Sequence, residues 1–114
     1  MTVLAPGIGG SVGKATFQLA RAQGGGKVIS TAGSAAKAAK ARALGFEDVV
    51  DLTAEGLAEG VRRITDGKGV DIVIESIGGA VTSEALSSLS LGGVLITLGY
   101  SAGRKSTIDV TDLI

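Results

Sequence analysis

A glycine-rich stretch near the start of the chain has residue types and a spacing suited to binding a phosphate group. Gly7, Gly10 and Gly13 follow a short apolar run at intervals of three residues. Gly7 lets the chain turn tightly off a strand, Gly10 has no side chain to keep a phosphate from the backbone, and Gly13 lets the next helix lie close to its strand. The unpaired N–H groups and the positive dipole end at the start of that helix attract anions. The stretch therefore indicates a pyrophosphate site, as dinucleotide-binding proteins have.

The spacing of this motif differs from the usual G-x-G-x-x-G of dinucleotide-binding turns. It reads G-x-x-G-x-x-G, with Val12 in place of a glycine and Gly9 as an additional one. A tight turn that binds nothing is the alternative interpretation. A P-loop is excluded, because Ile8 stands where its first glycine belongs and Ala15 where Ser or Thr would hold magnesium.

The end of the second expected strand bears on the choice of cofactor. NAD sites usually have Asp or Glu about 20 residues after the glycine turn, on the adenosine ribose. Residues 30–34 read STAGS and contain no acid, and Lys37 follows in the next helix. Hydroxyls and an ammonium group suit a 2′-phosphate, so the sequence favours NADPH over NADH. A solvated helix lysine at Lys37 and an ordinary helix N-cap at Ser34 are the alternatives.

The rest of the chain alternates between short apolar runs and helix-forming segments. Strands are expected at residues 3–5, 27–31, 48–52, 70–75 and 94–98, and helices at about 12–23, 34–44, 55–65 and 82–89. Thr53 is expected to cap the third helix, and Gly92 and Gly93 to form the turn before the last strand. The pattern predicts an α/β fold of the Rossmann type, a doubly wound parallel sheet of about five strands in the order 3-2-1-4-5 with helices on both faces. Ligands of such sheets bind outside the carboxyl ends of the strands.

The composition limits the chemistry that the chain can perform. Its 114 residues form one domain at most, and 45% hydrophobic but only 3% aromatic residues predict a core of small aliphatic side chains. The absence of Cys and His removes thiolate chemistry and the commonest metal ligand and general base, so we expect no metal site and no catalytic residue. Because 11 basic residues balance 11 acidic ones, nucleic acid is not an expected partner. Without a long apolar run or a signal-peptide pattern, a cytoplasmic protein with no membrane partner is expected.

Four segments together resemble one protein family. Residues 2–22, 28–45, 61–79 and 91–103 are similar to the cofactor-binding domain of the medium-chain dehydrogenase/reductase superfamily. Within it they most resemble the zinc-free quinone oxidoreductases and the related enoyl reductases. The resemblance covers nearly the whole chain. It implies an NADPH-dependent oxidoreductase that delivers hydride to a quinone or an enone, a conjugated carbonyl, without a metal.

The resemblance also implies which residues bind the cofactor. They form four groups: Gly9, Gly10, Ser11 and Val12 for the pyrophosphate; Gly33, Ser34 and Lys37 for the 2′-phosphate; Ser76, Ile77 and Gly78 for the nicotinamide-side ribose; and Gly99, Tyr100 and Ser101 near the nicotinamide. The chain departs from the family twice. Relatives often have Gly where Ser11 stands, and many have Tyr where Leu52 stands, whose hydroxyl contributes to the phosphate pocket.

Family members are longer than this chain and have an N-terminal substrate domain. Residues 1–114 therefore resemble an excised dinucleotide-binding domain. We expect no turnover from it alone, because hydride transfer needs a substrate pocket held over the nicotinamide. Its last strand would form an open edge of the sheet, and relatives dimerise on that side, so a homodimer is a further expectation.

Two other functions stay open at this point. A non-catalytic nucleotide-binding or sensing module would have the same motifs, and the sequence barely separates it from an oxidoreductase domain. A methyltransferase also has a glycine turn after its first strand. However, the acid that it usually has at the end of the second strand is missing from residues 30–34.

Overall fold

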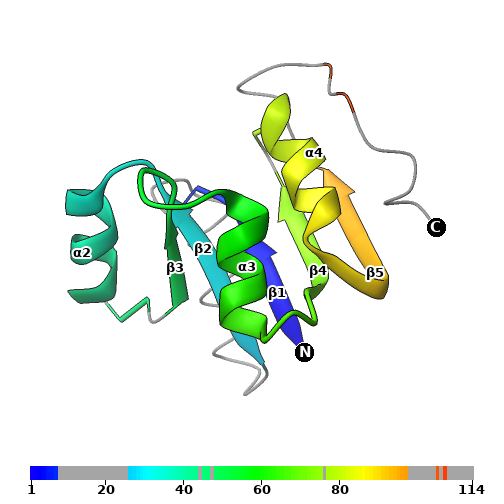
Figure 1. Cartoon of the computed structure of the whole chain (residues 1–114), viewed down its shortest axis with the longest axis horizontal. Coiled ribbons are helices and arrows are strands. Elements are labelled where there is room, and N and C mark those ends of the chain that lie inside the picture. Colours follow the sequence, from blue (N-terminus) through cyan, green and yellow to red (C-terminus); the bar gives the residue numbers. More distant parts are fainter. Residues whose placement is uncertain are drawn as a thin grey trace.

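The computed structural model describes residues 1–7, 26–43, 45–46, 48–75, 77–97, 105 and 107. These residues form a sheet with helices packed on it (Figure 1). The strands are β1 (Thr2–Ala5), β2 (Lys27–Ala32), β3 (Asp48–Asp51), β4 (Val70–Glu75) and β5 (Leu89–Thr97). The helices are α2 (Ala35–Ala43), α3 (Leu57–Thr65) and α4 (Ala80–Ser87).

The strands are parallel and lie in the order β3-β2-β1-β4-β5. This confirms the predicted strand order. Because all strands point the same way, their carboxyl ends lie on one edge of the sheet, from Asp51 of β3 to Thr97 of β5. The chain leads from β1 outward to β2 and from β4 outward to β5, so the switch point lies between β1 and β4, which pair through Val3 and Ile72.

Helices cover both faces of the sheet. On one face Val50 of β3 lies in a core cluster with residues of α3 and α4, and on the other face Val49 packs with Ala38 and Ala41 of α2. The adjacent residues Val49 and Val50 serve opposite faces because side chains alternate along a strand. The larger cluster consists of Leu4, Ile29, Val50, Leu57, Val61, Val70, Val73 and Ala85. The buried core of the described residues is thus aliphatic, as the composition predicts.

Local signals set both ends of α2. The Oγ of Ser34 accepts the N–H of Lys37 at 3.2 Å, which makes Ser34 the N-cap. Gly45 follows the helix with a φ of 101°, in the region that favours glycine, and donates its N–H to the carbonyl of Arg42. Ser34 thus acts as the helix N-cap that the sequence offers as an alternative to a phosphate ligand.

The prediction that Thr53 caps α3 is wrong. The N-cap of α3 is Gly56, and no side chain caps it. Thr53 instead donates its N–H and its hydroxyl to Oδ1 of Asp51. A carboxylate two residues away offers the threonine a local partner, and this turn delays the start of the helix to Leu57.

The prediction of a turn at Gly92 and Gly93 is also wrong, because both residues lie inside β5. The register between β4 and β5 shifts between the pairs Val70–Leu89 and Ile72–Val94, so the intervening residues of β5 form a bulge. Gly92 has a φ of 80° in this bulge, which explains why glycine occurs there.

Candidate cofactor-binding site

Two buried hydroxyls tie the carboxyl ends of β1 and β2 together. The Oγ of Ser30 donates to the carbonyl of Ala5 at 2.7 Å, and the Oγ1 of Thr31 accepts the N–H of Gly7 at 3.0 Å. Only 3% and 4% of these two residues are exposed. The turn after β1 therefore starts from a fixed point. Ser30 and Thr31 are too buried to be the hydroxyls that the sequence offers to a 2′-phosphate.

The corner between β2 and α2 presents the three residues that the sequence assigns to a 2′-phosphate. Gly33 and Lys37 are exposed and Ser34 is half-buried. A Cβ added to Gly33 would meet no atom within 4 Å, so the corner is open. The Oγ of Ser34 accepts a backbone N–H, which leaves its own hydroxyl hydrogen as a donor. The corner thus offers a hydroxyl donor and an ammonium group.

Leu52 lies beside this corner. Its N–H donates to the carbonyl of Ala32 at 3.0 Å, and 41% of the residue is exposed. The end of β3 therefore adjoins the end of β2, where the family resemblance implies a tyrosine hydroxyl. Leu52 offers apolar surface there instead of a hydrogen-bond donor.

A fully buried carboxylate stands at the carboxyl end of β4. The Oε1 of Glu75 accepts the backbone N–H groups of Ile77 and Gly78, and its Oε2 accepts the hydroxyl of Thr82 at 2.8 Å. These three donors compensate for burial of the carboxylate. Glu75 is not among the residues that the sequence predicts to lie in the site. The signal that could have identified it is an acidic residue directly between an apolar strand and a glycine-containing turn.

The turn between β4 and α4 meets the start of the turn after β1. Gly78 has a φ of 77°, and Gly79 has a φ of 60° with a ψ of −138°, a backbone that side chains rarely allow. A Cβ added to Gly7 would lie 3.4 Å from Cδ1 of Ile77. Gly7 and Ile77 therefore lie in contact at the switch point, the place where ligands of this fold bind.

The other predicted site residues lie outside the part of the chain that the structure describes. They are Gly9, Gly10, Ser11, Val12, Ser76, Gly99, Tyr100 and Ser101. Their assignment stays a prediction. Among the described residues, the corner after β2 and the turn after β4 lie on the same edge of the sheet, with Gly7 after the strand between them.

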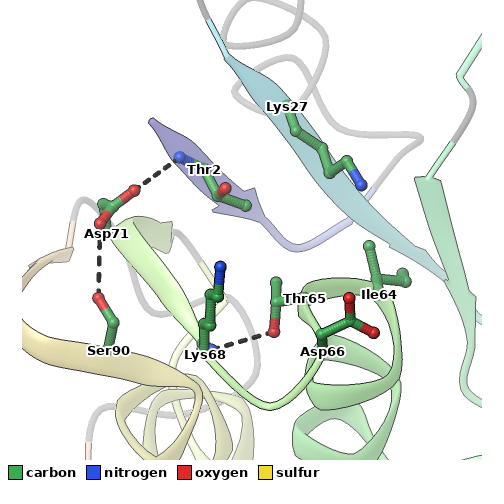
Figure 2. Close-up of a pocket in the computed structure, with 9 residues that line it drawn as sticks. Thr2, Lys27, Ile64, Thr65, Asp66, Lys68, Asp71 and Ser90 are labelled. Atoms are coloured by element: carbon green, nitrogen blue, oxygen red, sulfur yellow. Dashed lines mark hydrogen bonds between the residues drawn. The ribbon is translucent and has the colours of Figure 1, made fainter.

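A pocket of about 420 Å³ lies at the amino ends of the strands, opposite to their carboxyl ends (Figure 2). Its charged lining residues are Lys27, Asp66, Lys68 and Asp71, so two carboxylates balance two ammonium groups. The carbonyl end of α3, where the helix dipole is negative, adjoins the pocket at Asp66. Asp71 already accepts the N–H of Thr2 at 2.8 Å. These charges do not suit a pyrophosphate. Ligands of this fold bind at the carboxyl ends of the strands, away from this pocket.

Hydrogen bonds from Thr53 determine the titration of Asp51 at the end of β3. The hydroxyl of Thr53 has the larger effect and its N–H the smaller, and together they hold the pKa of Asp51 below the ordinary value of 3.8. In the same loop Glu55 pairs with Arg63 of α3, and these hydrogen bonds lower the pKa of Glu55 and raise the pKa of Arg63. Because both groups reach solvent, the pair contributes little stability and mainly orients the loop.

Among the described residues, no group of three or more His, Cys, Asp or Glu side chains could hold a metal ion. None of the helices in that part of the chain has the length and apolar character needed to cross a membrane.

The sequence is similar to known oxidoreductases. A family model described as zinc-binding dehydrogenase matches residues 11–114. The chain is 30% identical over 113 residues to the quinone oxidoreductase-like protein 2 homolog of Nematostella vectensis. The match covers 99% of this chain and 31% of that protein.

The structure is similar to solved reductases. The crystal structure of 2-haloacrylate reductase is 35% identical, with a TM-score of 0.86 over 98% of this chain and 35% of the other. Escherichia coli quinone oxidoreductase, crystallised as a complex with NADPH, is 32% identical, with a TM-score of 0.82 over 98% of this chain and 34% of the other. The chain thus spans about a third of the length of these proteins.

Proposed function

This chain belongs to the zinc-binding dehydrogenase family, and we propose that it is the NADPH-binding domain of a zinc-independent oxidoreductase that delivers hydride to a quinone or a conjugated carbonyl. Its structural relatives are the quinone oxidoreductases and related reductases that the sequence resembles. The observation that carries the proposal is the contact between Gly7 and Ile77 at the switch point, at the same ends of the strands as the open corner at Gly33. When bound, the nicotinamide supplies the hydride, and this chain's residues bind and orient the cofactor.

The metal in the family's name does not fit this chain. Zinc sites in proteins are built mainly from Cys and His, and this chain contains neither. The proposed hydride transfer therefore uses no zinc held by these residues.

The described residues fit a dinucleotide that runs along the carboxyl edge of the sheet. Ser34 and Lys37 would hold the 2′-phosphate at the open corner, through a hydroxyl and an ammonium group. The pyrophosphate would lie on Gly9 to Val12, and the nicotinamide half would lie by Ile77 and Gly78. The preference for NADPH over NADH rests on the missing acid at residues 30–34 and is supported by the NADPH complex of the E. coli relative.

The names of the relatives support the proposed substrate class. A quinone and a 2-haloacrylate each have a carbon–carbon double bond conjugated to a carbonyl or carboxyl group, which makes the molecule accept hydride. Because the chain spans about a third of these proteins, turnover is proposed for a longer protein with a substrate domain. Family membership argues against the methyltransferase alternative. A non-catalytic module would follow if the complete protein had no substrate domain.

An open strand at the edge of the sheet supports the proposal of a homodimer. On β5, Leu91, Val94 and Ile96 are 94%, 54% and 42% exposed. β5 has only one neighbour within the described sheet, so its other side can pair with a second copy.

Calorimetric titration of the chain with NADPH and with NADH tests the cofactor. We expect NADPH to bind more tightly. Lys37→Glu should weaken the binding of NADPH by about tenfold or more and the binding of NADH much less, since a charge-assisted hydrogen bond contributes about 1.5–3 kcal/mol.

The matched control is Lys40→Glu, which makes the same charge change on an exposed residue one turn further along α2. It should affect NADPH much less than the change at Lys37. No binding of either dinucleotide at millimolar concentration would contradict the proposed function. Equal losses of affinity for both dinucleotides would show that Lys37 is not part of the 2′-phosphate site.

A further inference from the structure

We propose that Glu75 is a positioning residue for the nicotinamide half of the cofactor. Its buried carboxylate locks the turn between β4 and α4 and so holds Ile77 against Gly7 at the switch point. The identity of the ligand rests on the proposed function, whereas the locking of the turn rests on the hydrogen bonds alone.

Two amide groups of the turn between β4 and α4 are already used within the protein. The amide hydrogens of Ile77 and Gly78 are both donated to Glu75. Gly79 is the N-cap of α4 and has no side chain to cap the helix, and a helix start attracts an anion. The carboxylate of Glu75, bonded to Thr82 in the early part of α4, supplies that negative charge from within the protein. The turn therefore does not compete for the pyrophosphate, and the half-buried side chain of Ile77 is left to contact a ligand.

Glu75 also makes the turn between β4 and α4 more rigid. Gly78 and Gly79 both have positive φ, and glycine loses more conformational freedom on ordering than any other residue. Hydrogen bonds from residues 77 and 78 to one fixed carboxylate offset that loss. Since Cδ1 of Ile77 lies at contact distance from the Cβ position of Gly7, a displaced turn would change how the two turns meet at the switch point.

Glu75 does not take part in the reaction directly. Its exposed fraction is 0%, and both of its oxygens are occupied by donors of the protein. A substrate cannot reach the carboxylate without unfolding of the turn. Glu75 therefore acts through the position of Ile77.

The test compares Glu75→Met, which removes the acceptors at similar size, with Glu75→Gln, which keeps an acceptor of the same reach. Amide hydrogen exchange at Ile77 and Gly78, measured by NMR on the unliganded chain, reports the lock. Calorimetry then measures the affinity for NADPH and for the half-cofactor 2′-phosphoadenosine 5′-phosphate, which lacks the nicotinamide.

We expect Glu75→Met to speed exchange of both amides and to weaken NADPH about tenfold, which is about 1.4 kcal/mol, with the half-cofactor changed less than about twofold. Glu75→Gln should stay within about threefold of the parent for both ligands. A residue that only stabilised the sheet would lower both affinities together.

An unchanged NADPH affinity in Glu75→Met, or equal losses for the two ligands, would overturn the inference. If Glu75→Met does not fold, Thr82→Val takes its place, because it removes only the donor to Oε2. It should weaken NADPH about threefold and leave the half-cofactor unchanged, and the absence of this difference would overturn the inference. If the parent chain binds neither ligand, the proposed function fails, and amide exchange still decides whether Glu75 locks the turn.

Discussion

Gly60, in the middle of α3, is the position at which one methyl group should most disturb the contact between helix and sheet. A Cβ added there would lie 2.5 Å from Cγ1 and 2.7 Å from Cγ2 of Val50. Val50 is fully buried, and a valine side chain in a packed strand has little freedom to rotate away. Gly60→Ala therefore requires α3 to move off the sheet.

Two opposing effects determine the magnitude for Gly60→Ala. Alanine favours a helix interior over glycine by about 1 kcal/mol. Overpacking a core costs about 1–3 kcal/mol, and the upper end applies here because both methyl groups of Val50 are overlapped. We expect a net loss of about 1–2 kcal/mol in the free energy of unfolding, or a fall of several degrees in Tm.

Urea unfolding followed by circular dichroism measures this loss. The matched control is Gly60→Ala in a Val50→Ala background, where the obstructing methyl groups are absent. In that background the change at Gly60 should be neutral or stabilising. A Gly60→Ala protein as stable as the parent, or the same penalty in both backgrounds, would refute the reasoning.

Two further predictions concern the ends of β2 and β3. Thr31→Val leaves the N–H of Gly7 without its acceptor and should reduce stability by about 1 kcal/mol and weaken NADPH, whereas Thr31→Ser should keep the affinity. Urea unfolding and calorimetry check this, and equal losses of affinity in both variants would contradict it. Asp51 has a folded-state pKa below its ordinary 3.8, so its hydrogen bonds with Thr53 stabilise the fold above that pH and are lost as the pH falls through the folded value. Asp51→Asn should therefore flatten the acid side of the stability profile, and an unchanged acid side would show that this carboxylate does not contribute.

The order of the strands could be predicted because alternating strands and helices leave few topologies. The strand at Val70–Glu75 has the predicted bounds, since a nearly continuous apolar run is typical of a central parallel strand. The interior of β5 could not be predicted. Gly92 and Gly93 have the composition of a turn, and only pairing with β4 makes them a bulge in a strand.

The side-chain partners within the site were harder to predict than the strands. The sequence indicates that residues 30–34 follow β2, but the same hydroxyl types can face a ligand or a neighbouring strand. In the structure Thr31 faces β1 and Ser34 faces the start of α2. The role of Glu75 was missed because its three donors come from residues after the strand, in a turn whose path depends on glycine conformations. Local competition explains the error at Thr53, which has a carboxylate within reach.

The open corner at Gly33 has a consequence for protein engineering. Cofactor preference is often exchanged by placing an acid where the adenosine ribose lies, and in this chain the neighbouring positions are not equivalent. An acid at Ser30 or Thr31 would be buried and would break the link between the first two strands. Gly33 has room for a side chain and a backbone that accepts one, so it is the position from which a designer would begin to convert the proposed NADPH site to an NADH site.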